Sequence, residues 1–100
     1  MVTEFTNRVI EIIRGIPRGY VMSYGAVARK AGSPRGARQV VRVLRSCSEK
    51  HDLPWHRVVN SRREIGFRDE ESYARQRALL EAEGVRFGED GRIAAEFMVE

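Results

Sequence analysis

Closely spaced helix-breaking residues divide the first half of this chain into short helices. Gly15, Pro17 and Gly19 end the first apolar pattern, and Gly32 ends the second. A chain of 100 residues provides one modest hydrophobic core, so these pieces must share it. The pattern therefore predicts a single domain over residues 1–100 that is built from several short helices.

Apolar residues at helical spacing define the first two of these helices. Residues 4–14 follow Thr3, a residue type that caps helix N-termini. Residues 24–31 follow Ser23, a second cap, and precede Gly32, which suits the position after a helix end. The predicted apolar faces contain Phe5, Val9, Ile12, Ile13 and Ile16 in the first helix and Val27, Ala28 and Ala31 in the second.

A third helix is predicted to begin with Ser33 as its N-cap and Pro34 as its first residue. Its apolar face would contain Ala37, Val40, Val41 and Leu44. Two short helices joined by a few residues that include a glycine are typical of a helix-turn-helix unit, here at about residues 24–46. A simple helical hairpin is the alternative that this pattern leaves open.

The second half of the chain has weaker patterns. Residues 46–54 lack periodicity and are predicted to form a loop, and residues 58–59 form a brief extended piece. A fourth helix is expected at about residues 70–83, after Asp69 as its cap, and residues 85–94 favour a small hairpin. The predicted fold class is mainly α with a small β component.

Positive charge is concentrated in the first two thirds of the chain. Residues 1–63 contain 13 Arg and Lys and 4 Asp and Glu, whereas residues 64–100 contain 5 and 10. Arginine supplies nearly all of the positive charge, and its planar guanidinium suits phosphate groups. The excess favours a nucleic-acid partner, with an ordinary solvated basic surface as the alternative.

Several classes of protein are disfavoured. The lone Cys47 allows no internal disulfide and favours a reducing compartment, and His51 and His56 add too few ligands for a zinc site. The chain has no apolar run near 20 residues, and its first residues lack the layout of a signal peptide. We therefore expect a cytoplasmic monomer, nucleoid-associated if the source is bacterial, with no metal, cofactor or membrane segment.

Four short motifs occur in a fixed order. They are Ser23-Tyr24-Gly25 with Val27-Ala28, Gly36-Ala37-Arg38, Pro54-Trp55-His56-Arg57-Val58-Val59, and Leu79-Leu80 leading to Glu83-Gly84. Over about residues 3–97 this order and spacing resemble the C-terminal DNA-binding domain of the O6-alkylguanine-DNA alkyltransferase family. The resemblance is greatest to its alkyltransferase-like branch, in which tryptophan or another residue replaces the active-site cysteine. It implies a winged helix-turn-helix-like domain of the alkyltransferase C-terminal type.

Trp55 occupies the place that the resemblance gives to the reactive cysteine. A thiolate can accept an alkyl group, but an indole has no basic lone pair, so no catalytic residue is expected. The resemblance implies a DNA damage sensor that flips O6-alkylguanine into a pocket near Trp55, within a loop at about residues 54–69, and marks it for nucleotide excision repair proteins. Trp55 could instead fill vacated volume or contact a protein partner, and a small helix-turn-helix transcriptional regulator without lesion specificity is the alternative function.

The resemblance also assigns residues to the DNA interface. Arg38 matches an arginine that enters the base stack, and Tyr24 matches a tyrosine that crowds the phosphate of the flipped nucleotide. Gly36 and Ala37 would allow close approach in the minor groove, and Arg68 would sense the modified base. Weaker phosphate contacts are assigned to Arg35, Arg42 and Arg45. Arg38 could instead contact a phosphate, Tyr24 could pack on the core, and Arg68 could be an ordinary exposed arginine ahead of a helix.

Three further residues are expected to support the pocket. His56 and Glu83 match residues that help to activate the alkyltransferase cysteine, and without a cysteine we expect a buried hydrogen-bonded pair that holds the loop. Asn60 is expected to close a turn through its side chain. Val41 and Arg42 depart from the glycines that alkyltransferases usually carry after the arginine, which affects how deeply the helix can enter a groove.

Overall fold

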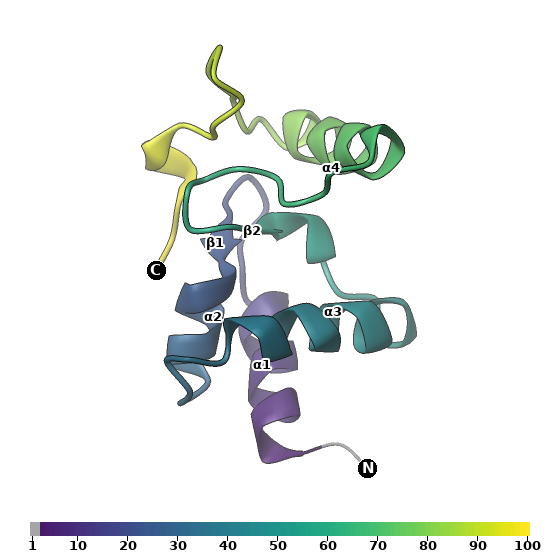
Figure 1. The fold of residues 1–100 in the computed structure, drawn as a ribbon, viewed down its shortest axis with the longest axis vertical. Coiled ribbons are helices and arrows are strands. Elements are labelled where there is room, and N and C mark those ends of the chain that lie inside the picture. Colours follow the sequence, from purple (N-terminus) through teal and green to yellow (C-terminus); the bar gives the residue numbers. More distant parts are fainter. Residues whose placement is uncertain (1–2) are drawn as a thin grey trace.

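Three helices pack together at one end of the molecule, a two-stranded parallel sheet lies in the middle, and a fourth helix lies at the other end (Figure 1). The computed structural model describes residues 3–100. In chain order its elements are α1 (Glu4–Arg14), β1 (Met22–Ser23), α2 (Tyr24–Lys30), α3 (Ala37–His51), the 3₁₀ turn η1 (Trp55–Arg57), β2 (Val58–Val59), α4 (Glu70–Ala82) and the 3₁₀ turn η2 (Ala95–Phe97). The predicted fold class is confirmed.

Three of the four helices begin at the predicted cap. Thr3, Ser23 and Asp69 each accept a hydrogen bond from the backbone N–H three residues further along the chain, at 3.1, 3.0 and 2.9 Å. Gly32 follows α2 with φ +92°, a conformation that favours glycine. Side-chain caps therefore set these helix starts, as the sequence indicates.

The third helix begins later than predicted. Ser33 does not cap it, because the N–H of Gly36 donates to the Ser33 carbonyl at 2.8 Å and closes a turn, so that α3 begins at Ala37. Gly36 is buried, and a Cβ added there would lie 3.1 Å from Cζ of Phe5 and 3.0 Å from Oγ of Ser33. Close packing against α1 therefore explains the glycine at position 36.

The third helix also ends later than predicted. Residues 46–51, expected in a loop, continue α3 as far as His51, and Asp52 ends it in the left-handed conformation with φ 51°. Leu44 and Cys47 pack against the hydrophobic core on this helix. Tertiary contacts thus maintain the helix where polar residues weaken its apolar pattern.

The small sheet joins two hydrophobic clusters. Met22 pairs with Val58 and Ser23 pairs with Val59, in parallel register. Successive residues of a strand face opposite sides, and accordingly Val58 belongs to one cluster and Val59 to the other. The first cluster lies among α1, α2 and α3, and the second consists of Val21, Val59, Leu80, Val85 and Ile93.

The C-terminal segment returns to the sheet (Figure 1). Val21, just before β1, donates its N–H to the Phe97 carbonyl and accepts from the Val99 N–H, both at 2.8 Å. The hairpin predicted at residues 85–94 occurs as one antiparallel bridge, between Phe87 and Ile93. Within residues 3–100, no helix is long and apolar enough to cross a membrane.

We predict that Gly36→Ala lowers the free energy of unfolding by about 1–3 kcal/mol, because the added methyl must displace the Phe5 ring and Ser33. Urea denaturation measures the change. The control is Gly25→Ala in α2, where an added Cβ meets only the Arg29 guanidinium, at 3.6 Å. That substitution should be neutral or should stabilise by up to about 1 kcal/mol. Equal effects of both substitutions would contradict the packing explanation.

Candidate nucleic-acid interface

Four arginines form a positively charged face on α3 and the turn before it. Arg38, Arg42 and Arg45 follow one another at intervals of four and three residues, which places them on one side of the helix, and Arg35 lies three residues earlier. All four are exposed, and among residues 3–100 none forms a salt bridge. The buried residues of α3 lie on its opposite side, so this face, hereafter the arginine face, is free to meet a polyanion.

Tyr24 connects the start of α2 to the loop after β2. Its hydroxyl oxygen lies 3.7 Å from the position that a Cβ on Gly66 would occupy. Burial raises the pKa of Tyr24, although the charge of Arg45 acts in the opposite direction. The structure therefore brings Tyr24 to the loop at Gly66, which is far from it in the sequence.

Trp55 lies at the centre of a partly exposed cluster. Its ring meets the His56 ring edge-on at 6.0 Å between centroids and the Phe67 ring edge-on at 6.1 Å. The guanidinium carbon of Arg75, from α4, lies over the indole at 5.7 Å from its centroid. We call Trp55, His56, Phe67 and Arg75 the tryptophan cluster. Sequence reasoning missed Arg75, because only the tertiary fold brings α4 to this loop.

Gln76 fixes the backbone that follows Trp55. It is 1% exposed, and its side-chain amide donates to the carbonyls of His56 at 3.0 Å and Val58 at 3.1 Å. These bonds tie η1 and β2 to α4. The sequence contained a signal for this role, because Gln76 lies four residues before the buried Leu80 on the same face of the helix.

The predicted pair of His56 and Glu83 is confirmed, within a larger network. His56 Nε2 lies 2.6 Å from Glu83 Oε2, Arg57 donates to both Glu83 oxygens, and the Gly19 N–H donates to Oε1 at 2.9 Å. Burial alone would raise the pKa of Glu83, but the hydrogen bonds from Arg57, His56 and Gly19 outweigh it and lower the pKa to about 2. The sequence pattern indicated neither Arg57 nor Gly19 as a partner.

The loop after β2 begins with a closed turn. Asn60 accepts hydrogen bonds through Oδ1 from the N–H groups of Arg62 and Glu64, both at 2.9 Å, which confirms the turn predicted for it. Arg68 is exposed directly before Asp69, the cap of α4. Within residues 3–100, the Arg68 side chain makes no hydrogen bond or salt bridge, so its guanidinium remains available.

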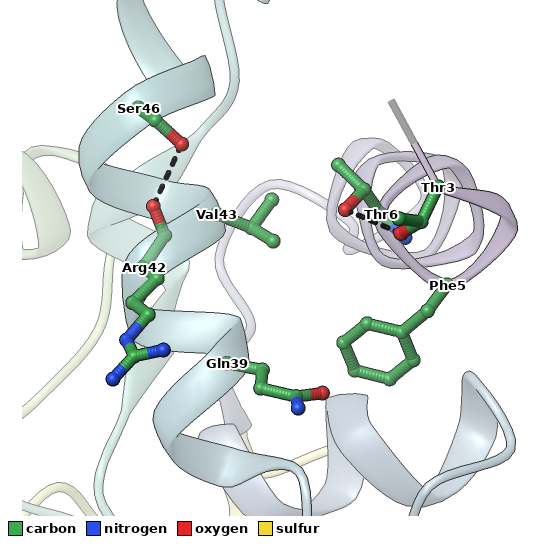
Figure 2. A pocket seen from close by; sticks show the side chains of 7 residues that line it. All are labelled: Thr3, Phe5, Thr6, Gln39, Arg42, Val43 and Ser46. Carbon is green, nitrogen blue, oxygen red and sulfur yellow. Dashed lines mark hydrogen bonds between the residues drawn. The ribbon is translucent and has the colours of Figure 1, made fainter. Parts of the chain in front are cut away.

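A groove of about 480 Å³ lies between α1 and α3 (Figure 2). Its lining consists of Thr3, Phe5, Thr6, Gln39, Arg42, Val43 and Ser46, with the Ser46 hydroxyl donating to the Arg42 carbonyl at 2.8 Å. A second hollow of about 360 Å³ lies along α1, next to Lys30 at the end of α2. Trp55 lines neither hollow, so the pocket predicted near Trp55 is neither of these two grooves and stays a prediction.

Comparison with known proteins agrees with this architecture. Residues 4–85 match the family model of the 6-O-methylguanine DNA methyltransferase DNA-binding domain. The chain belongs to this family. The DNA base-flipping protein of Escherichia coli (strain K12) is 49% identical over 90 residues, which cover 90% of this chain and 69% of that protein. Alkyltransferase-like protein 1 of Schizosaccharomyces pombe is 42% identical over 83 residues, 82% of this chain and 77% of that protein.

A solved structure supports the same assignment. The crystal structure of S. pombe Atl1 in complex with damaged DNA containing O6-carboxymethylguanine matches with a TM-score of 0.82 and 37% identity. The match covers 97% of this chain and 95% of Atl1. The family and the helix-turn-helix-like architecture inferred from the four motifs are therefore confirmed.

We predict that Glu83→Gln lowers the free energy of unfolding by about 3 kcal/mol at neutral pH, because it removes the charge that Arg57 and His56 bind. The native pKa of Glu83, about 2, lies below its ordinary value of 4.5. The contribution of the carboxylate is therefore complete above about pH 5 and is lost as the pH falls from 4.5 toward 2.

Urea denaturation at several pH values measures this effect, and the difference between wild type and variant should shrink in that range. Glu81→Gln is the control, because Glu81 is exposed and pairs only with Arg77, at 3.5 Å. That substitution should cost less than about 1 kcal/mol at any pH. A Glu83→Gln difference that stays constant down to pH 2 would contradict the assigned role of the network.

Proposed function

We propose that the protein is a non-enzymatic sensor that binds duplex DNA, flips O6-alkylguanine out of the base stack and holds it near Trp55. The observation that carries the proposal is the position of Trp55 in the family motif, in a domain whose arginine face on α3 forms no salt bridge among residues 3–100. Two relatives, the DNA base-flipping protein of E. coli and S. pombe Atl1 in complex with damaged DNA, support the same function.

The chemistry of Trp55 supports binding without alkyl transfer. An indole offers a flat apolar surface and an N–H donor but no nucleophilic lone pair. Cys47 is no replacement, because it lies on α3 and packs against the helical core. His56 and Glu83 remain bound to one another in a structural network. The site can therefore hold an alkylated base but has no group placed to accept its carbon.

The arginine face suggests how the protein would meet DNA. We place α3 in the minor groove, with Arg38 entering the stack where the base has left and Arg35, Arg42 and Arg45 on phosphates. Tyr24 lies close to Arg45, where the two could act on one displaced phosphate. Gly36 packs closely against Phe5 inside the protein, and Ala37 is the small residue at the start of α3.

The later steps are part of the same proposal. The DNA complex would be passed to nucleotide excision repair proteins, which only the family resemblance suggests, and the protein would act as a monomer in the cytoplasm. A sequence-specific regulator would use the same arginine face, but it would have no use for the tryptophan cluster. Lesion preference therefore distinguishes the two functions.

A binding titration tests the proposal. One fluorescently labelled duplex carries guanine, O6-methylguanine or a bulkier O6 adduct at a single position, at fixed salt. We expect at least about tenfold tighter binding to both adducts than to guanine, because an alkylated base is easier to extrude and gains contacts with Trp55. With an isotopically labelled methyl group, the protein should remain unlabelled. Equal affinity for all three duplexes, or transfer of the label, would contradict the proposal.

The role proposed for Arg38, insertion into the base stack, makes a separate prediction. Arg38→Ala should reduce the preference for lesion over undamaged DNA by about tenfold, because its stacking is used only when a base is flipped. Arg45→Ala should weaken binding to both duplexes alike. It should also reduce by about one the slope of the logarithm of the binding constant against the logarithm of the salt concentration. If the two variants change lesion preference equally, Arg38 does not act in flipping.

A further inference from the structure

Two arginines of α4 lie over aromatic rings, but only one has other partners. Arg77 lies over the Phe87 ring at 4.4 Å, donates to the Tyr73 hydroxyl at 3.3 Å and pairs with Glu81 at 3.5 Å. Arg75, two residues earlier, lies over Trp55 at 5.7 Å. Among residues 3–100, its guanidinium forms no salt bridge and donates no hydrogen bond. Arg75 is thus a cation held beside Trp55 with its donors unused.

The surroundings leave this positive charge uncompensated. Glu83 does not pair with Arg75, because its carboxylate is already bound by Arg57 and His56. Glu71, one turn before Arg75 on the same helix, does not lie within salt-bridge distance of it. The rings of His56 and Phe67 meet the indole edge-on, whereas the exposed Arg75 guanidinium lies over its face. A negatively charged group placed against Trp55 would therefore meet an available guanidinium.

The chemistry of the ligand follows from this arrangement. A guanidinium can bind a carboxylate through two parallel N–H donors, whereas a neutral alkyl group offers it no acceptor. We propose that Arg75 is a specificity-determining residue that makes the Trp55 site prefer O6 substituents carrying a carboxylate over neutral ones of the same size. This rests on the proposed function, because the substituent must first be brought to Trp55.

The test compares two nearly isosteric lesions in one duplex, O6-carboxymethylguanine and its neutral amide, O6-carbamoylmethylguanine, with guanine as the reference. We expect the wild-type protein to bind the carboxylate about tenfold more tightly than the amide, a typical effect of a charge-assisted hydrogen bond. Arg75→Gln should reduce this ratio to within about twofold, and Arg75→Lys should retain part of it.

Arg77→Gln is the matched control, because it removes the same charge from the same helix. It should weaken binding to all three duplexes and leave the ratio unchanged. Far-ultraviolet circular dichroism checks that each variant is folded, because Trp55 emission itself responds to the loss of the Arg75 charge.

The outcomes separate this inference from the proposed function. If wild-type protein binds both lesions no better than guanine, the proposed function fails. If it prefers both lesions over guanine but binds the carboxylate and the amide equally, the selectivity proposed for Arg75 is overturned. This outcome needs only the wild-type protein, so it does not depend on the stability of any variant. An Arg75→Gln ratio equal to that of wild type, or an equal loss in Arg77→Gln, would also overturn it.

Discussion

One buried carboxylate, that of Glu83, joins the parts of this structure that carry the site. Arg57 bridges Glu83 to the Ile16 carbonyl at 2.9 Å, just after α1, and the Gly19 N–H binds the same carboxylate. Glu83 follows α4, whereas Arg57 belongs to the 3₁₀ turn that begins with Trp55. The network therefore fixes the tryptophan motif between the three-helix end and α4. Because this ion pair is almost fully buried and bonded on several sides, breaking it leaves an unpaired charge in the interior.

The same framework carries two surfaces to which the proposed function assigns different tasks. The arginine face lies on the exposed side of α3, and its charge suits a phosphate backbone. The tryptophan cluster is assembled from η1, the loop after β2 and α4, and its flat ring and nearby cation suit a single base. Tyr24, the first residue of α2, packs against the loop at Gly66. A base lifted from DNA on the first surface would thus have a receiving site on the second.

Local signals predicted much of the fold, because caps and glycines act over a few residues. Thr3, Ser23 and Asp69 set helix starts as expected, whereas Ser33 did not, since packing of Gly36 on α1 decided that boundary. The motifs identified Trp55, His56 and Glu83. They did not reveal Gly19, because a glycine N–H becomes a partner only through tertiary folding. The spacing of Gln76 from Leu80 indicates a shared helix face but not which carbonyls the amide binds.

The central claim is that a damaged guanine leaves the duplex and reaches Trp55, the single tryptophan of the chain. Its intrinsic emission therefore reports directly on the site, without a label. Titration with a duplex containing O6-methylguanine should produce a saturable change in emission as the base packs against the indole, and the same duplex with guanine should produce almost none at equal occupancy. An identical change with both duplexes, or no change with the lesion at saturation, would contradict the account.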